Sequence, residues 1–161
     1  MATLTVWKFD TATGAQEALD KLADLSKQQL IQIQDAAVVS WPAGKKSPKT
    51  KNYGSMTGQG ALSGAFWGML FGLIFFVPFF GLAVGAAMGA LAGKFADYGI
   101  NDNFIKEVRE KVTEGTSALF LLSANAVQDR VLAAFEGVNM ELIASNLSAE
   151  QEAALREQFE A

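Results

Sequence analysis

The chain has 161 residues, neither cysteine nor histidine, and a formal net charge of −4. Disulfides, zinc sites of the usual kind and catalytic triads with a histidine base are therefore excluded. Residues 1–54 carry seven lysines against five acidic residues, whereas residues 94–161 carry six basic against twelve acidic residues. This acidic C-terminal part argues against nucleic acid as a partner, because nucleic-acid binders present a broad basic face.

The N-terminal segment predicts a strand, a helix and a second strand. Residues 3–9, TLTVWKF, alternate and are rich in β-branched and aromatic types, as strands are. Residues 14–29 repeat Ala and Leu at helical spacing, and residues 31–41, IQIQDAAVVSW, predict another extended segment before a loop. The start lacks the features of a secretion signal, so we expect it to stay on the protein. Candidate helix caps are Asp10 and Thr11 or Thr13.

The middle of the chain contains two runs of four glycines, on either side of Pro78. No charge lies between Lys51 and Lys94. Residues four apart share one helical face, so each run forms a groove that lets backbones approach closely. A glycine inside a helix costs about 1 kcal/mol relative to alanine, so eight of them indicate a packing role. The expected packing and oligomerisation residues are Gly60, Gly64, Gly68, Gly72, Gly81, Gly85, Gly89 and Gly93.

These glycines predict a glycine-zipper helical hairpin inserted over residues 55–96, with lipid, a partner chain or its own domain beside it. The first arm, residues 58–76, would be about 28 Å long, close to a hydrocarbon core of about 30 Å. The second arm is shorter and the tip is strongly apolar, so the hairpin could span, re-enter the membrane or be buried in an oligomer. The expected inserting residues are Trp67, Phe71, Phe75, Phe76, Pro78, Phe79 and Phe80.

Lysines flank the hairpin on both sides. Basic residues next to an inserted segment favour the cytoplasmic side of a membrane and can contact anionic headgroups. The alternative is an ordinary solvated loop. The candidate headgroup contacts are Lys45, Lys46, Lys49, Lys51 and Lys94.

The C-terminal part predicts a helix near residues 102–112, a buried strand at 116–123, a helix at 125–136 and a strand at 138–145. Ser148 and Gln151 form a capping box that opens a final helix. With the N-terminal segment, these elements make two βαβ halves. We therefore expect a ferredoxin-like α+β sandwich, split into residues 1–54 and 97–161 by the hairpin.

Several of these stretches together resemble a known family. TLTVWKF, LIQIQDAAVVSW, the double glycine run, TSALFLL, LSAEQEAALRE and, as the most specific part, GKFADYGINDNFIKEV are similar to the bacterial and archaeal family DUF1269. The resemblance covers nearly the whole chain. It implies the same architecture and association with a membrane, since members are described as predicted membrane proteins, but no catalytic residues. The layout is also similar to that of some general-stress proteins.

The sequence therefore predicts a protein without catalytic, cofactor or metal sites. The leading hypothesis is a membrane-associated protein, with its α+β domain on the cytoplasmic side, that assembles with copies of itself and inserts its hairpins into the bilayer or remodels it, in a stress response. The second hypothesis is a soluble ring, shell or filament with the hairpins bundled in its core. A third, a small-molecule binder or enzyme on the open sheet face, rests on fold analogy alone.

Overall fold

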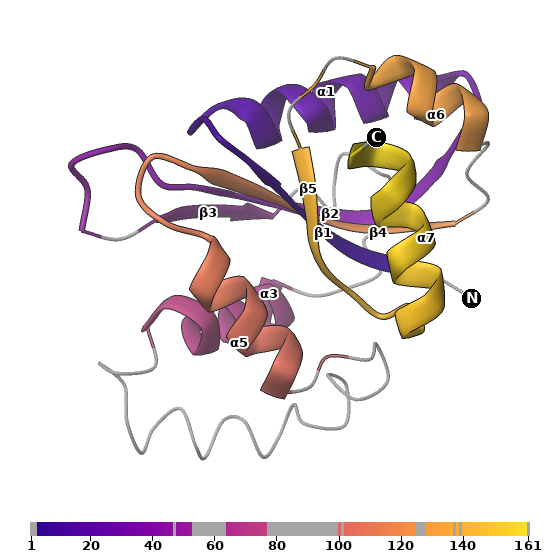
Figure 1. The fold of residues 1–161 in the computed structure, drawn as a ribbon. Helices are drawn as coiled ribbons and strands as arrows, with labels where there is room; N and C mark the ends of the chain where they lie inside the picture. Colours follow the sequence, from indigo (N-terminus) through magenta and orange to yellow (C-terminus); the bar gives the residue numbers. More distant parts are fainter. Residues whose placement is uncertain are drawn as a thin grey trace.

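The computed structural model describes residues 3–46, 48–52, 64–76, 100, 102–124, 128–136, 138 and 140–160. Within these residues, strands form one antiparallel sheet with helices packed on both faces (Figure 1). The strands are β1 Thr3–Phe9, β2 Gln32–Ser40, β3 Lys49–Asn52, β4 Ser117–Ala124 and β5 Met140–Ser145. The helices are α1 Gly14–Lys27, α3 Gly64–Phe71, the π-helical η1 Gly72–Phe76, α5 Asp102–Lys111, α6 Gln128–Ala134 and α7 Ala149–Glu160.

The strand order is β3-β2-β4-β1-β5, which places β4 at the centre of the sheet. β4 pairs antiparallel with β1 on one side and with β2 on the other. The predicted α+β class and all four predicted strands are confirmed. Strand β3 was not predicted, because the segment KTKN is short and polar and is a strand only through its pairing with β2. Lysines on such an edge strand disfavour pairing with further strands.

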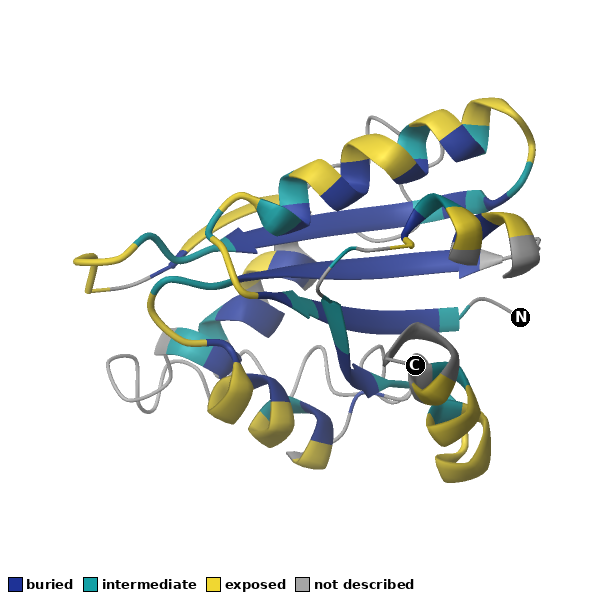
Figure 2. Ribbon diagram, turned by 45° about the horizontal axis from the view of Figure 1, so that its top comes forward, coloured by how far each residue is buried: buried dark blue, intermediate teal, exposed yellow. Residues whose placement is uncertain are grey.

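One face of the sheet is covered by α1 and α6, which lie together above it in Figure 1. The buried side chains of α1 recur at helical spacing, and its charged residues face away from the sheet (Figure 2). Thr13 precedes α1 but makes no capping bond with its side chain. Instead the Ala15 backbone N–H donates to Ser117 Oγ on β4, at 2.9 Å. A hydroxyl distant in sequence thus satisfies this helix terminus.

The opposite face is covered by α3, η1 and α5 (Figure 1). α5 turns Phe104 and Val108 toward the sheet, and the charged side chains that are described on this helix are exposed. The sheet therefore separates two apolar clusters, one toward α1 and the other toward α3 and α5.

The C-terminal helix α7 follows β5 and contacts it. Its predicted capping box is confirmed. The Gln151 backbone N–H donates to Ser148 Oγ at 3.2 Å, and the Ser148 N–H donates to Gln151 Oε1 at 3.3 Å.

Candidate functional site

The most unusual part of the described chain is residues 64–76, here called the arm, which consists of α3 and η1. The arm has no charged residue, yet one of its sides is packed into the core. The Trp67 and Phe71 rings stack with their centroids 5.7 Å apart, and the Phe71 and Phe120 rings meet edge to face at 5.1 Å. The arm side chains that are almost fully buried are Trp67, Leu70, Phe71 and Ile74. For these residues, the neighbour is the chain's own domain.

A buried carboxylate lies beneath the arm. Asp35 on β2 has an exposed fraction of 0%. Its Oδ2 accepts a hydrogen bond from Trp67 Nε1 at 3.3 Å, and its Oδ1 accepts one from the Ala36 N–H at 2.9 Å. Burying an ionised group is costly unless hydrogen bonds compensate it, so these bonds help to keep Asp35 inside.

An irregularity in β2 directs Asp35 toward the arm. The pairing of β2 with β4 shifts between Ile33 and Asp35. Ile33 belongs to the cluster on the α1 side, whereas Asp35 is paired with Leu122 of the other cluster. Two residues that are two apart normally share a face, so the bulge reverses the alternation.

The far end of the arm is held by contacts from two other elements. Arg109 on α5 donates from Nε to the Ile74 carbonyl oxygen at 2.9 Å. Phe75 meets Trp41 edge to face, with the centroids 6.2 Å apart. Carbonyls at the end of a helix lack intrahelical donors, and a cation near them is favourable.

Two glycines of the arm are accessible to solvent. Gly68 is exposed and Gly72 is half-exposed. A Cβ placed on either glycine would meet no atom of the described residues within 4 Å. The arm therefore has an aromatic side bound to the sheet and a glycine side, defined by Gly68 and Gly72, that is open among the described residues.

Several sequence-predicted residues lie outside the described part of the chain. These are Gly60, Gly81, Gly85, Gly89, Gly93, Pro78, Phe79, Phe80 and Lys94. The backbones of Gly64 and Phe76 are described, but their surroundings are not. Among the helices that are described, none is long and apolar enough to cross a bilayer.

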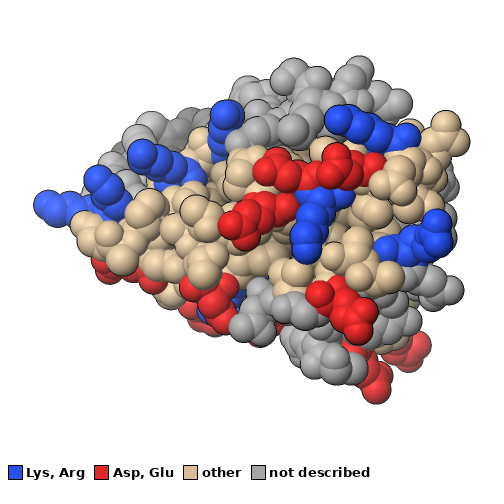
Figure 3. Space-filling view, turned by 90° about the horizontal axis from the view of Figure 1, so that it is seen from above, with Lys and Arg blue, Asp and Glu red and all other residues tan. Residues whose placement is uncertain are grey.

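Of the five predicted lysines, the four in the described part of the chain lie in the β2–β3 turn and in β3. Lys45 and Lys46 are exposed in the β2–β3 turn, which projects at the left of Figure 1 and forms part of the basic end in Figure 3. Lys49 and Lys51 pair with Ser40 and Val38, so they lie on the α1 face of the sheet. The sheet thus separates Lys49 and Lys51 from the arm.

The turn itself is held in place. Trp41 Nε1 donates to the Lys45 carbonyl at 2.9 Å, and the Gly44 N–H donates to the Glu114 carboxylate. Because Trp41 also contacts Phe75, the lysine-bearing turn and the end of the arm share one tryptophan.

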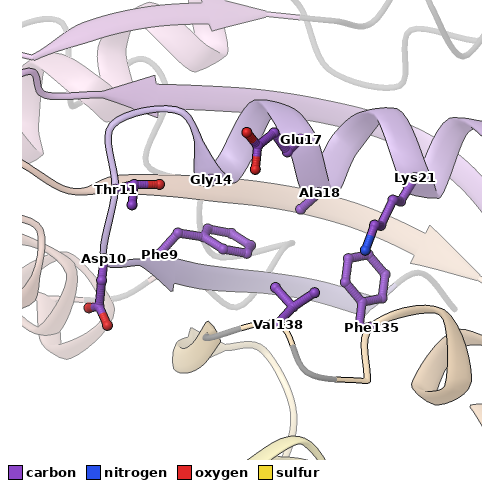
Figure 4. A pocket seen from close by; sticks show the side chains of 9 residues that line it. All are labelled: Phe9, Asp10, Thr11, Gly14, Glu17, Ala18, Lys21, Phe135 and Val138. Carbon is purple, nitrogen blue, oxygen red and sulfur yellow. The ribbon is translucent and has the colours of Figure 1, made fainter.

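A shallow pocket of about 220 Å³ lies on the opposite face, between the start of α1 and the end of α6 (Figure 4). Lys21 crosses it, with its ammonium 5.6 Å from the centre of the Phe135 ring. In Figure 4 the carboxylates of Asp10 and Glu17 point away from each other, so they do not converge on a ligand. Nor do the described acidic side chains form a group able to hold a metal ion. The arm is therefore the stronger candidate site.

The fold and the arm define a class of protein: an α+β domain in which the chain leaves the sheet after an edge strand, forms an apolar glycine-bearing helix, and returns before α5. Residues 61–160, from the arm to the terminal helix, match the family described as "Protein of unknown function (DUF1269)". The chain belongs to this family, as its resemblance predicted. No curated protein and no solved structure matches it.

Proposed function

We propose that this protein is a non-enzymatic, self-assembling protein that acts at membranes. The docked arm presents its glycine side to a second helix, and the uncharged residues that follow it enter the bilayer. The observation that carries this proposal is the division of α3 into a buried aromatic side and an exposed glycine side. A helix that is apolar or glycine-lined outside as well as inside is unusual at a water-facing surface.

Close helix packing is the physical use of such a surface. Glycines four residues apart let two helices approach until their backbones touch, and this contact replaces the larger side chains of ordinary packing. The exposed Gly68 leaves room for a partner helix, because no described atom occupies the space beside it. The partner is either the second glycine run of the same hairpin or the arm of another copy.

We also propose a specific topology for the domain, namely a ferredoxin-like core with an inserted glycine-zipper hairpin. The order β5-β1-β4-β2 and the two units β1-α1-β2 and β4-α6-β5 support the core. α1 and α6 contribute to one cluster on the same face, as two such units require. β3 then extends the sheet at one edge, and the chain enters the arm from there.

A soluble homo-oligomer is the second candidate, and a specific observation favours it. The arm's Trp67, Leu70, Phe71 and Ile74 are covered by the chain's own sheet, so in this conformation they are not available to lipid. An assembly of docked arms joined through their glycine sides would need no bilayer. The uncharged residues after the arm would then fill the centre of the assembly.

The test compares the natural chain with Gly68→Leu, with Ala153→Leu on the exposed side of α7 as a matched control. Each variant is expressed without detergent and fractionated, and particle size is measured by light scattering. We expect Gly68→Leu to reduce particle size severalfold because its side chain separates the packed backbones. The control should keep the natural size.

Each outcome distinguishes the candidates. Recovery in membranes supports the membrane-associated form, and a large particle in the supernatant supports the soluble assembly. A monomeric natural chain in the supernatant would contradict both. An assembly that Gly68→Leu leaves unchanged would remove the glycine side of α3 from the interface.

A further inference from the structure

We propose that the arm docks reversibly on the sheet and that the Asp35–Trp67 pair controls its release. This inference rests on the proposed function, because release is useful only if the protein acts at a membrane. Release would turn four large apolar side chains from the protein core toward a bilayer. Three features of the described chain support this proposal: the bulge in β2, the buried Asp35 carboxylate and the separation of the two apolar clusters.

The bulge places a carboxylate where an apolar side chain would otherwise pack. Asp35 faces the cluster that contains Trp67, Leu122 and Phe120, and none of these brings a charge. A carboxylate there stabilises the docked arm less than a well-packed apolar residue would, because desolvation opposes its hydrogen bonds. The carboxylate instead makes docking specific, because it stabilises the arm only in the position in which the Trp67 indole N–H donates to Oδ2.

Release of the arm would recover part of that desolvation cost. Once α3 leaves, water reaches Asp35 and replaces the indole donor. Compared with an apolar side chain at this position, the carboxylate therefore favours the released state, whereas its hydrogen bond to Trp67 favours the docked state. Because the two effects oppose each other, the free-energy difference between the docked and released states stays small.

The arm can leave without dissolving the rest of the fold. The cluster under α1 contains none of the arm side chains whose surroundings are described, and the sheet separates it from those side chains. Local opening of one packed element below the free energy of global unfolding is common in proteins. The arm is itself part of the predicted insertion over residues 55–96, and one described contact that holds its far end is the Arg109 bond from α5.

The absence of cysteine makes this testable with a single introduced thiol. Leu70→Cys reports exposure of the arm's buried side, and Leu19→Cys reports exposure of the α1 core; both leucines are fully buried. The rate of labelling by a maleimide measures how often each site opens. Hydrogen exchange of the amides of residues 64–76 in the natural chain gives the same information without a substitution.

We expect the thiol at position 70 to label about tenfold or more faster than the thiol at position 19, because the arm opens locally. Equal rates, together with equally slow exchange in the arm and in β4, would overturn reversible docking. If the Leu70→Cys variant does not fold, hydrogen exchange alone decides this point.

A double-mutant cycle tests the pair. Asp35→Asn keeps an acceptor for the Ala36 N–H but turns an NH₂ toward the indole donor, and Trp67→Phe removes the donor. Each single variant should speed opening by about 3- to 10-fold, because the hydrogen bond between the indole N–H and the carboxylate is lost. Their combination should open less than the product of the two effects, since donor no longer faces donor. Independent effects would overturn the role of the pair.

Asp24→Asn is the matched control, because it removes the same charge from an exposed site on α1 and should leave opening unchanged.

A vesicle-binding experiment distinguishes release of the arm from the proposed membrane function. Vesicles of phosphatidylcholine and phosphatidylglycerol should retain more of the Asp35→Asn variant than of the Asp24→Asn variant. If opening occurs but vesicle binding does not, the membrane function fails while reversible docking stands.

Discussion

α1 and the arm cover opposite faces of the same sheet, and they differ mainly on their outer sides. α1 buries Leu19 and Leu22 and exposes Asp20 and Lys21, so one side packs and the other contacts water. The arm buries its aromatic side equally well, but its outer side carries Gly68 and Gly72 and no charge.

This comparison separates two reasons for an apolar segment in a sequence. The apolar positions of α1 are explained entirely by the core that they fill. The core explains the buried aromatic side chains of the arm, but it does not explain the exposed glycines, because a polar residue there would form a better helix in water. The exposed glycines indicate a second neighbour for the arm, whereas α1 needs none.

The largest effect should come from truncating the residue on which the arm rests. Phe120 is fully buried on β4 and meets both Trp67 and Phe71 edge to face. Phe120→Ala should lower the free energy of unfolding by about 3–5 kcal/mol, measured by urea denaturation.

The adjacent residue Leu121 faces the α1 cluster and is the control for the other side of the sheet. Hydrogen exchange should accelerate mainly in the arm for Phe120→Ala and mainly in α1 for Leu121→Ala. If Phe120→Ala accelerates both helices equally, the two faces are not independent.

A glycine in the α1 region should be much less replaceable than one on the arm. A Cβ on Gly14 would lie 2.5 Å from the Phe9 Cβ, so the backbone or Phe9 must move. Gly14→Ala should cost about 1–3 kcal/mol through overpacking, seen as a lower urea midpoint. An unchanged midpoint would mean that this turn adjusts freely.

The end of the arm should respond to loss of its anchor. Arg109→Met removes the bond from Nε to the Ile74 carbonyl, and we expect a loss of about 1 kcal/mol. The amides of residues 72–76 should exchange faster than in Lys106→Met, a control on the exposed side of α5. The same exchange rates in both variants would show that the anchor contributes nothing to docking.

The smallest effect should be a gain. Gly68→Ala adds a methyl group where no described atom lies within 4 Å, so the dilute chain should become about 0.5–1 kcal/mol more stable. Thermal unfolding at low and high protein concentration measures this. A loss of stability in the dilute chain would mean that Gly68 already has a close neighbour within one molecule.

Local pattern was enough to predict much of the fold. Alternation in TLTVWKF, the leucine spacing of α1 and the Ser148–Gln151 capping box each depend on residues close in sequence. Such signals survive without knowledge of distant partners. The α+β class followed from them and is confirmed. The family resemblance, which rested on the likeness of whole stretches to a known family, is confirmed as well.

Distant pairing decided what the pattern left open. Ser117 rather than Thr13 bonds the start of α1, and KTKN becomes an edge strand only because β2 lies beside it. The bulge at Asp35 reverses which face that carboxylate occupies, and no local spacing specifies such a shift.

By itself, the sequence determined that an uncharged, glycine-spaced segment interrupts an α+β domain, because composition and spacing are local properties. Only the tertiary structure decided which side of that segment is already satisfied. Trp67 and Phe71 would suit lipid, a partner or a core equally well, since burial of an apolar side chain is non-directional. The sheet beneath them, and the Asp35 carboxylate that the bulge turns toward the indole, selected the core and left the glycine side open.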